Sequence, residues 1–340
     1  MSADAVIEKP VPFDRELPLL DLALNRQTAR NHFRRRLPRL SGDGKLRLKK
    51  IRLIRHKQGR RCVVEYDVEV DRPDAPKEFV TLIGKTRVRR SGNEAFRLQR
   101  AIWDSGFDSA SPDGISVPEP IGVIASFQMW FQRKVEGPTV EKFLTTNSGV
   151  HLARRVAQAI HKLHAAGVPT DKSHTINDEL KILRECFEQV AALNPQWSQR
   201  LDRLLIACEQ LSARTPVGGN RGIHRDFYSS QVIVDGERLW LLDFDLYCRG
   251  DPALDAGNFI AHITEQALRE LGSPDALLEV ERALEEEFIR LSGEPARPAL
   301  HLYRDLTLAR HILLSTKFPE RNHLTERLLE LCETRFRSSA

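Results

Sequence analysis

The feature that most constrains the fold of this chain is a change of hydrophobic periodicity near residues 135–138. Before this point, apolar residues form short runs typical of strands, and after it they recur at the spacing of amphipathic helices. A chain of 340 residues is too long for one simple core and suits two lobes. The pattern therefore predicts an α+β fold with a β-rich N-lobe over residues 1–136 and a mainly helical C-lobe over residues 137–340.

The predicted N-lobe contains five strands and one helix. Its first two strands form a hairpin, because Gly59 stands between two apolar runs at a turn signal. The helix is expected over residues 91–105, where apolar side chains approach helical spacing. Residues 1–20 are predicted to be a loosely held arm and residues 21–40 a basic helix. The five expected strands are residues 51–56, 61–70, 79–88, 121–127 and 129–135.

The predicted C-lobe is helical except for one small hairpin. Residues 151–167 place apolar side chains on one helical face and end in Gly167, a typical helix stop. One or two further helices are expected over residues 178–213. Two short apolar runs, residues 231–236 and 239–244, are joined by an Asp-Gly turn, which indicates a hairpin. The chain after residue 252 is expected to be largely helical.

Composition excludes several classes of protein. With 41% hydrophobic and 29% charged residues, the chain can build a sizeable core, so global disorder is excluded. No apolar run approaches the roughly 20 residues of a membrane span, and the N-terminus lacks the pattern of a signal peptide. The five cysteines are scattered and contain no CxxC pair, which argues against disulfides or zinc and predicts a cytoplasmic protein.

Charge is distributed unevenly along the chain. Residues 26–61 hold fifteen Lys or Arg and one acid, a net of +14, so the remainder carries 5 − 14 = −9. The arginines of this basic segment cannot all be buried or paired, and we expect them to be mostly exposed. The segment also suggests an anionic partner such as a nucleic acid, although the chain contains no recognisable DNA- or RNA-binding motif.

The residues that carry chemistry flank the small C-lobe hairpin. The triplet His224-Arg225-Asp226 precedes it, Gln231 opens it, and Asp243-Phe244-Asp245 closes it. Phosphoryl transfer needs a carboxylate that orients the attacking hydroxyl and oxygen ligands that hold Mg²⁺ on the phosphates. The spacing from Asp226 to Gln231 matches the kinase pattern H-R-D-x-x-x-x-N, with Gln in place of Asn.

The stretch GIHRDFYSSQVIVDGERLWLLDFDLYCRGDPALDAGNF, residues 222–259, resembles the core motif of the aminoglycoside phosphotransferase and choline kinase family of small-molecule kinases. The hairpin IRHKQGRRCVVEYDV and the segment RKVEGPTVEKFL resemble that family's nucleotide loop and hinge. The similarity spans roughly residues 45–260. It implies a bilobal protein-kinase-like fold, with ATP as phosphate donor, GTP as the alternative, and Mg²⁺ as metal.

The resemblance also implies roles for individual residues. Asp226 would be the catalytic base, and Gln231 and Asp243 the metal ligands. Lys85 would touch the nucleotide phosphates, and Gly59 marks the nucleotide loop, although no full G-x-G-x-x-G is present.

The role of Glu94 has two interpretations. It would either pair with Lys85 or close a capping box with Ser91 at the start of its helix. Asp255 would brace the catalytic loop, Asp251 would begin a helix, and His161 and His164 have core spacing. The acidic run of residues 285–287 is interpreted as a solvated face.

The sequence therefore predicts an ATP-dependent phosphotransferase that acts on a hydroxyl group of a small molecule. It identifies neither the acceptor nor the oligomeric state. One alternative is a pseudokinase or scaffold without turnover, which the sparse glycine loop and Gln231 favour. Another is a nucleic-acid-binding protein that uses residues 26–61. Nucleotide turnover with Mg²⁺ would separate the first class from the other two.

Overall fold

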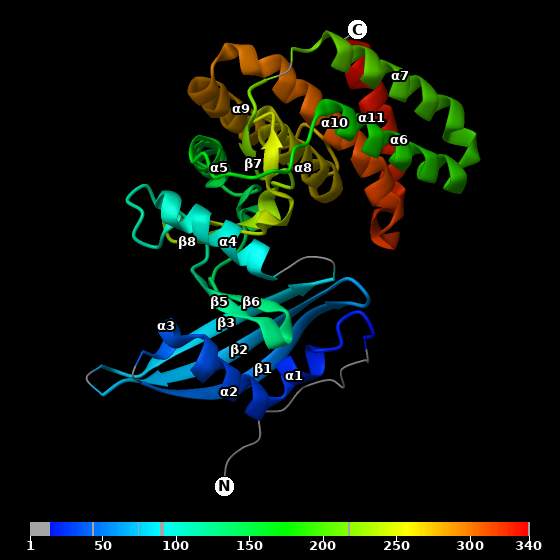
Figure 1. The fold of residues 1–340 in the computed structure, drawn as a ribbon. Helices are drawn as coiled ribbons and strands as arrows, with labels where there is room; N and C mark the ends of the chain where they lie inside the picture. The colour runs from blue at the N-terminus through cyan, green and yellow to red at the C-terminus, as the bar shows by residue number, and fades with distance from the viewer. Residues whose placement is uncertain (1–13, 43, 74, 89–91, 217, 339–340) are drawn as a thin grey trace. The chain divides into compact units, whose positions relative to one another are not determined.

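The computed structural model describes residues 14–338 except 43, 74, 89–91 and 217. The chain forms two compact units, Met1–Glu136 and Gly137–Ala340 (Figure 1). An antiparallel sheet dominates the first unit and helices dominate the second. The predicted α+β class is therefore confirmed.

A five-stranded antiparallel sheet, in the order β1-β2-β3-β6-β5, forms the body of the first unit. Gly59 adopts a φ of +65° in the turn between β1 and β2, a conformation that glycine accepts without steric cost. A further short strand, β4, covers Ile115–Ser116. The strands of the sheet are β1 Lys45–Lys57, β2 Arg61–Asp71, β3 Glu78–Arg87, β5 Pro120–Ile124 and β6 Met129–Arg133.

Four α-helices accompany this sheet among the described residues, so the prediction of a single helix was wrong. They are α1 Leu20–Leu24, α2 Arg26–Arg36, α3 Pro38–Ser41 and α4 Gly92–Ile102. The expected continuous helix over residues 21–40 is divided at both ends of α2. The Asn25 side chain accepts a hydrogen bond from Thr28 N at 2.9 Å, and Pro38 follows at the next break.

Helix α2 packs against β1 and β5 and supplies a central core residue. The Phe33 ring lies edge-on to Tyr66 at 5.0 Å and to Phe131 at 5.3 Å between ring centroids. All three side chains are fully buried. Aromatic pairs in this arrangement contribute about 0.5–1.5 kcal/mol beyond their buried area, so α2 is an integral part of the core.

The described part of the N-terminal arm, residues 14–20, is also packed, which corrects the prediction of a loosely held segment. Leu17 and Leu20 belong to the same hydrophobic core as the sheet. Asp14 is buried and accepts hydrogen bonds from Gly59 N at 3.0 Å and from His56 Nε2 at 2.8 Å. Burial alone would raise the pKa of Asp14, but the hydrogen bonds from Gly59 and His56 outweigh it and hold the pKa below its ordinary value. Residues 1–13 lie outside the described part.

The basic segment is exposed over most of α2. Arg30 and residues 34–36 point into solvent, as predicted. Arg26 differs, because its guanidinium donates to the Leu48 carbonyl at 3.0 Å and is half-buried. Arg52, farther along, pairs with Asp67 at 2.6 Å. The side chain of Arg39 lies outside what the structure describes.

The second unit is built around two long helices, α8 and α10, that pack against each other. The α5–α9 pair and the helices α6, α7 and α11 complete this unit (Figure 1). A capping box between Thr175 and Asp178 starts α6. The helices are α5 Gly149–Ala165, α6 Ile176–Leu193, α7 Ser198–Arg214, α8 Ala253–Leu271, α9 Leu278–Ser292, α10 Arg297–Thr316 and α11 Thr325–Ser338.

Four short strands lie between α7 and α8. The predicted hairpin forms from β8 Val232–Asp235 and β9 Arg238–Leu241, and it turns at Gly236 with a φ of +57°. Strand β7 Arg221–Ile223 pairs with β10 Cys248–Gly250. Gly222 is required in β7, because a Cβ atom there would lie 1.9 Å from the Tyr247 hydroxyl.

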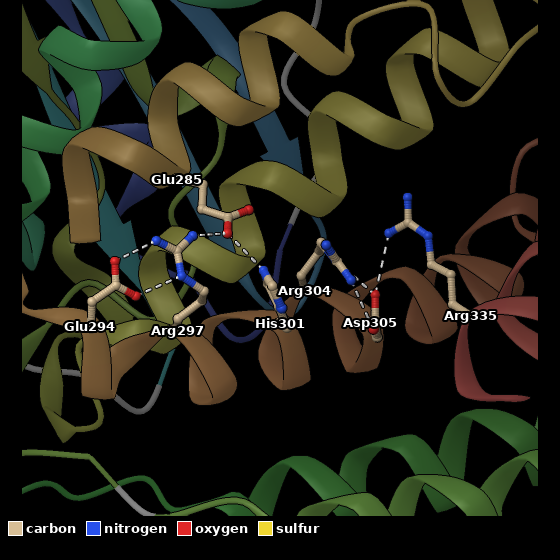
Figure 2. Close-up of polar contacts among 7 residues, drawn as sticks. All are labelled: Glu285, Glu294, Arg297, His301, Arg304, Asp305 and Arg335. Atoms are coloured by element: carbon tan, nitrogen blue, oxygen red, sulfur yellow. Dashed lines mark hydrogen bonds and ion pairs between the residues drawn. The ribbon is translucent and has the colours of Figure 1, made fainter. Parts of the chain in front are cut away.

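Ion pairs tie α9, α10 and α11 together (Figure 2). Glu285 lies 2.6 Å from Arg297 and 2.8 Å from His301. Burial would raise the pKa of Glu285, but these partners bring it to about 2. Asp305 is buried and contacts Arg304 at 2.8 Å and Arg335 at 3.3 Å.

The predicted solvated face over residues 285–287 is therefore only partly present. Glu286 is exposed, but Glu285 and Glu287 are half-buried and paired with neighbouring side chains. Within the described part of the chain, the helices fall short of the length and apolar character that a membrane span needs.

Candidate active site

The hairpin register brings two of the predicted site residues together. The strands pair Val232 with Leu241, so Gln231 and Leu242 are the next neighbours beyond the paired ends. Leu242 N donates to the Gln231 carbonyl at 2.9 Å. Asp243 follows Leu242 directly, so the side chains of Gln231 and Asp243 leave the backbone at the same end of the hairpin. Eleven residues separate them in the sequence, and the hairpin turn brings them together.

The backbone around the candidate site is strained at two positions. Arg225 has a φ of 71° and Asp243 a φ of 59°, which are left-handed values that residues other than glycine rarely adopt. Only Gln128 shares this property among the other non-glycine residues that the structure describes. Such conformations persist where surrounding contacts hold them, and they cluster at functional sites.

Asp255 braces the loop that carries Asp226, as predicted, and the catalytic role of this loop stays a prediction. This fully buried carboxylate accepts hydrogen bonds from His224 N at 2.8 Å and from Arg225 N at 2.7 Å. His164, on α5, contacts the same carboxylate at 2.9 Å between Nε2 and Oδ2. The His224 ring lies 2.7 Å from the Leu242 carbonyl. One carboxylate on α8 therefore fixes the two residues that precede Asp226.

A second chain of contacts, which the sequence did not reveal, supports the other side of the loop. Asn258 donates to the Phe227 carbonyl at 2.8 Å, and Arg310 donates to Asn258 at 3.0 Å. Arg310 also pairs with the buried Glu179 at 3.1 Å, and Glu179 contacts His174 at 2.5 Å. Asn258 lies within the conspicuous GNF triplet, but no local signal marks Arg310, 52 residues farther along.

Asp226 lies between these two supports, and its side chain reaches solvent. Desolvation by the surrounding protein raises its pKa, and the neighbouring charge of Asp243 raises it further. The nearby His224, Arg310 and Arg225 oppose this effect without cancelling it. The two carboxylates are thus close enough for the charge of one to affect the other.

The donor set at the end of the hairpin fits a hard cation. A Gln231 amide oxygen and an Asp243 carboxylate are oxygen ligands of the kind that Mg²⁺ accepts. No group of three or more His, Cys, Asp or Glu side chains suited to a metal occurs among the described residues. Mg²⁺ in nucleotide-dependent enzymes commonly uses one or two carboxylates together with phosphates and water, so a small protein donor set is compatible with it.

A cavity of about 630 Å³ adjoins Asp226 in the second unit. Its walls come from α6, α8, α10 and the loop that carries Tyr228, Ser229 and Ser230. The volume is large enough for a small organic molecule. Asp226 is therefore placed where a bound molecule could meet it.

The three predicted nucleotide-binding residues lie in the first unit. Lys85, on β3, places its ammonium 5.2 Å from the centre of the Trp130 ring. Glu94 is exposed in the first turn of α4. Whether it pairs with Lys85 stays a prediction, and Ser91 of the alternative capping box lies outside the described residues.

Gly59 adjoins a strongly basic recess of about 550 Å³. Lys57, Arg60, Arg61 and Arg87 line it, together with the acid Glu16. The charges of Arg55 and Arg61, followed by burial and Arg60, lower the pKa of Lys57. The positive potential that causes this shift would attract an anion to the β1–β2 turn.

Comparison with known sequences identifies the family of this chain. The profile of the phosphotransferase enzyme family matches residues 85–303. The chain therefore belongs to that family, and the predicted class of enzyme is confirmed. A search of curated protein sequences finds no match.

Solved structures of small-molecule kinases share the fold. A thermostable mutant of an aminoglycoside phosphotransferase, in complex with AMP-PNP and hygromycin B, has a TM-score of 0.56 at 16% identity, covering 92% of this chain and 99% of that one. Choline kinase from Streptococcus pneumoniae gives 0.54 at 13% identity, covering 86% and 94%. Plasmodium vivax ethanolamine kinase gives 0.55 at 14% identity, covering 98% of both chains.

Proposed function

We propose that this protein transfers the γ-phosphate of ATP to a hydroxyl group of a small molecule. The observation that carries the proposal is the placement of Asp226: a carboxylate on a doubly supported loop, beside Asp243 and at the wall of a cavity. The similar structures named for aminoglycoside and choline or ethanolamine substrates support a small-molecule acceptor.

In this proposal, Asp226 accepts or orients the proton of the acceptor hydroxyl. The hydroxyl oxygen forms a bond to the γ-phosphorus, and the bond from that phosphorus to the bridging oxygen breaks to release ADP. Asp255 and Asn258 act as positioning residues, because each holds the backbone of the loop that carries Asp226. A loop held in place before the substrate binds needs little reorganisation during the reaction.

Asp243 and Gln231 would hold Mg²⁺, which when bound neutralises the charge on the nucleotide phosphates. In the first unit, Lys85 and the β1–β2 turn at Gly59 would contact the nucleotide, with Glu94 as the partner of Lys85. The basic recess beside Gly59 supports this assignment, because phosphates are the anions that such a turn would attract.

Asp226→Asn tests the proposed base. Removing a general base commonly lowers the rate by about 10²–10⁴-fold, so ADP formation with a panel of hydroxyl-bearing metabolites should fall by that factor. Nucleotide binding, measured by calorimetry, should change little. Asp202→Asn, at an exposed position on α7, is the matched control. Normal turnover in the Asp226 variant would refute the assignment, and a wild-type protein that binds no nucleotide would favour a pseudokinase.

The metal ligands are tested by the Mg²⁺ dependence of nucleotide binding. Asp243→Ala should weaken binding only when Mg²⁺ is present, because it removes a charged ligand of the cation. Gln231→Asn keeps an amide oxygen and should retain part of the activity, whereas Gln231→Leu keeps the bulk and should lose most of it. An unchanged Mg²⁺ dependence in the Asp243 variant would move the metal site elsewhere.

A further inference from the structure

Among the described residues, Asp226 is the one lining acid of the cavity that is not engaged by a donor or a cation. Of its lining carboxylates, Glu141 accepts a hydrogen bond from the Ser230 hydroxyl at 2.5 Å and lies 3.6 Å from Arg269. Glu265 contacts Arg269 at 3.0 Å and Arg321 at 3.6 Å. Apart from Asp226 itself, the described acids of this cavity are thus already engaged by donors or cations.

Two cations at the rim of the cavity are less fully engaged. Lys317 is exposed at its rim, and no described carboxylate lies within 4 Å of its ammonium. Arg321 has only the longer contact to Glu265, a carboxylate that it shares with Arg269, and stacks on Phe318 at 5.1 Å. The rim near Lys317 and Arg321 therefore carries positive charge that the protein does not neutralise.

A buried histidine in the wall also lacks a partner. His311 is 4% exposed, and neither of its ring nitrogens has a hydrogen-bond partner. Burial lowers its pKa to about 3, and the charges of Arg310, Arg321 and Arg269 act in the same direction. The ring is therefore neutral near pH 7, with one donor and one acceptor. A buried polar group without a partner in a native protein indicates a missing ligand or water.

We propose that the acceptor carries an anionic group, a carboxylate or a phosphate, in addition to the hydroxyl that Asp226 meets. Lys317 and Arg321 would bind the anion, and a polar atom of the same molecule would satisfy His311. The apolar wall that includes Ile182 and Leu313 suits an aliphatic body between the two polar ends. This inference rests on the proposed function, and it distinguishes an acidic acceptor from the cationic amines that the net negative charge outside residues 26–61 would allow.

A matched set of alcohols tests the preference during turnover. 6-Hydroxyhexanoate, 6-hydroxyhexyl phosphate, 1,6-hexanediol and 6-amino-1-hexanol share a chain of six carbons with a hydroxyl at one end, and the diol carries a second, neutral hydroxyl where the others carry a charged group. ADP formation should give a kcat/KM for at least one anionic alcohol about tenfold above the neutral and cationic ones, and the better anion identifies carboxylate or phosphate. A preference for 6-amino-1-hexanol would overturn the proposal.

Charge-selective labelling of Cys186 tests the cavity without any catalysis. Cys186 lines the cavity and is partly accessible, whereas the other four cysteines are buried. The experiment compares the labelling rates of two methanethiosulfonate reagents, the anionic ethylsulfonate and the cationic ethyltrimethylammonium. Each rate is divided by the rate of the same reagent with a free thiol in solution. The anionic reagent should be favoured, and Cys186→Ser should abolish labelling.

The charge-reversing variant Lys317→Glu should shift the ratio of the two labelling rates about tenfold toward the cationic reagent, because it changes the local charge by two units. Lys181→Glu, at an exposed position on α6 outside the cavity wall, should leave the ratio unchanged. A wild-type ratio that favours the cation, or a ratio insensitive to Lys317→Glu, would overturn the anionic class. Because labelling needs no phosphate transfer, this result stands whether or not the proposed reaction is found.

Discussion

The catalytic loop and the β1–β2 turn are each held by a carboxylate, but the two carboxylates lie in different kinds of structure. In each case, a carboxylate distant in sequence accepts backbone N–H groups and contacts a histidine: Asp255 with His164, and Asp14 with His56. Asp255 is fully buried on α8, a helix of 19 residues in the middle of its unit. Asp14 lies on an irregular segment before α1.

This difference separates two kinds of loop support. The position of the catalytic loop is a consequence of the packing of α8, so it cannot change without disturbing the core. The β1–β2 turn depends on a short segment outside the regular helices and strands, which Leu17 and Leu20 anchor in the core of the sheet. The packing of the core therefore fixes the loop of the proposed catalytic base. The proposed nucleotide loop is fixed instead by a tether, the segment around Asp14.

The largest effect is expected at Asp255. Asp255→Ala leaves one buried and one partly buried backbone N–H group without an acceptor, and each such loss costs about 1–3 kcal/mol. The free energy of unfolding should fall by about 3–5 kcal/mol in urea titrations followed by circular dichroism. Asp255→Asn keeps one carbonyl oxygen and should lose less. A loss in the Ala variant below about 1 kcal/mol would contradict the dependence of the loop on this residue.

A smaller and more local effect is expected at Asp14. Asp14→Ala removes the acceptor of Gly59 N and should cost about 1–2 kcal/mol. Amide hydrogen exchange should accelerate in the β1–β2 turn and stay unchanged in the catalytic loop. Asp21→Ala, at an exposed position on α1, is the control. Equal acceleration in both loops would show that the two supports are not independent.

The smallest effect is a pH dependence of the tether. Because the pKa of Asp14 is lowered in the folded protein, its contribution to stability is complete above its ordinary value of 3.8. The contribution is lost as the pH falls through the folded-state pKa. The difference in free energy of unfolding between the wild-type protein and Asp14→Asn should therefore be constant from about pH 5 to 6 and shrink below about pH 4. A difference that grows toward acid would contradict the assignment.

The sequence by itself determined the features that depend on near neighbours. Apolar runs marked the strands of the sheet, Gly59 and the Asp235-Gly236 pair marked two hairpin turns, and the spacing from Asp226 to Gln231 and Asp243 marked the candidate site. Such signals work because side-chain periodicity and turn conformation are set within a few residues. The resemblance of residues 222–259 to small-molecule kinases carried the class of enzyme, which the family match confirmed.

Only the tertiary structure decided which distant groups meet. Gly59 and Asp14 are 45 residues apart, and Arg310 lies 52 residues beyond Asn258. Periodicity shows that a face is buried but not what it is buried against, so the sequence predicts a loose arm at Asp14 and gives no sign of the role of Arg310. The charge of the acceptor cavity likewise depends on residues that are distant in the sequence. Lys317, Arg321 and Glu265 gain their relation to Asp226 only when α8 and α10 pack together.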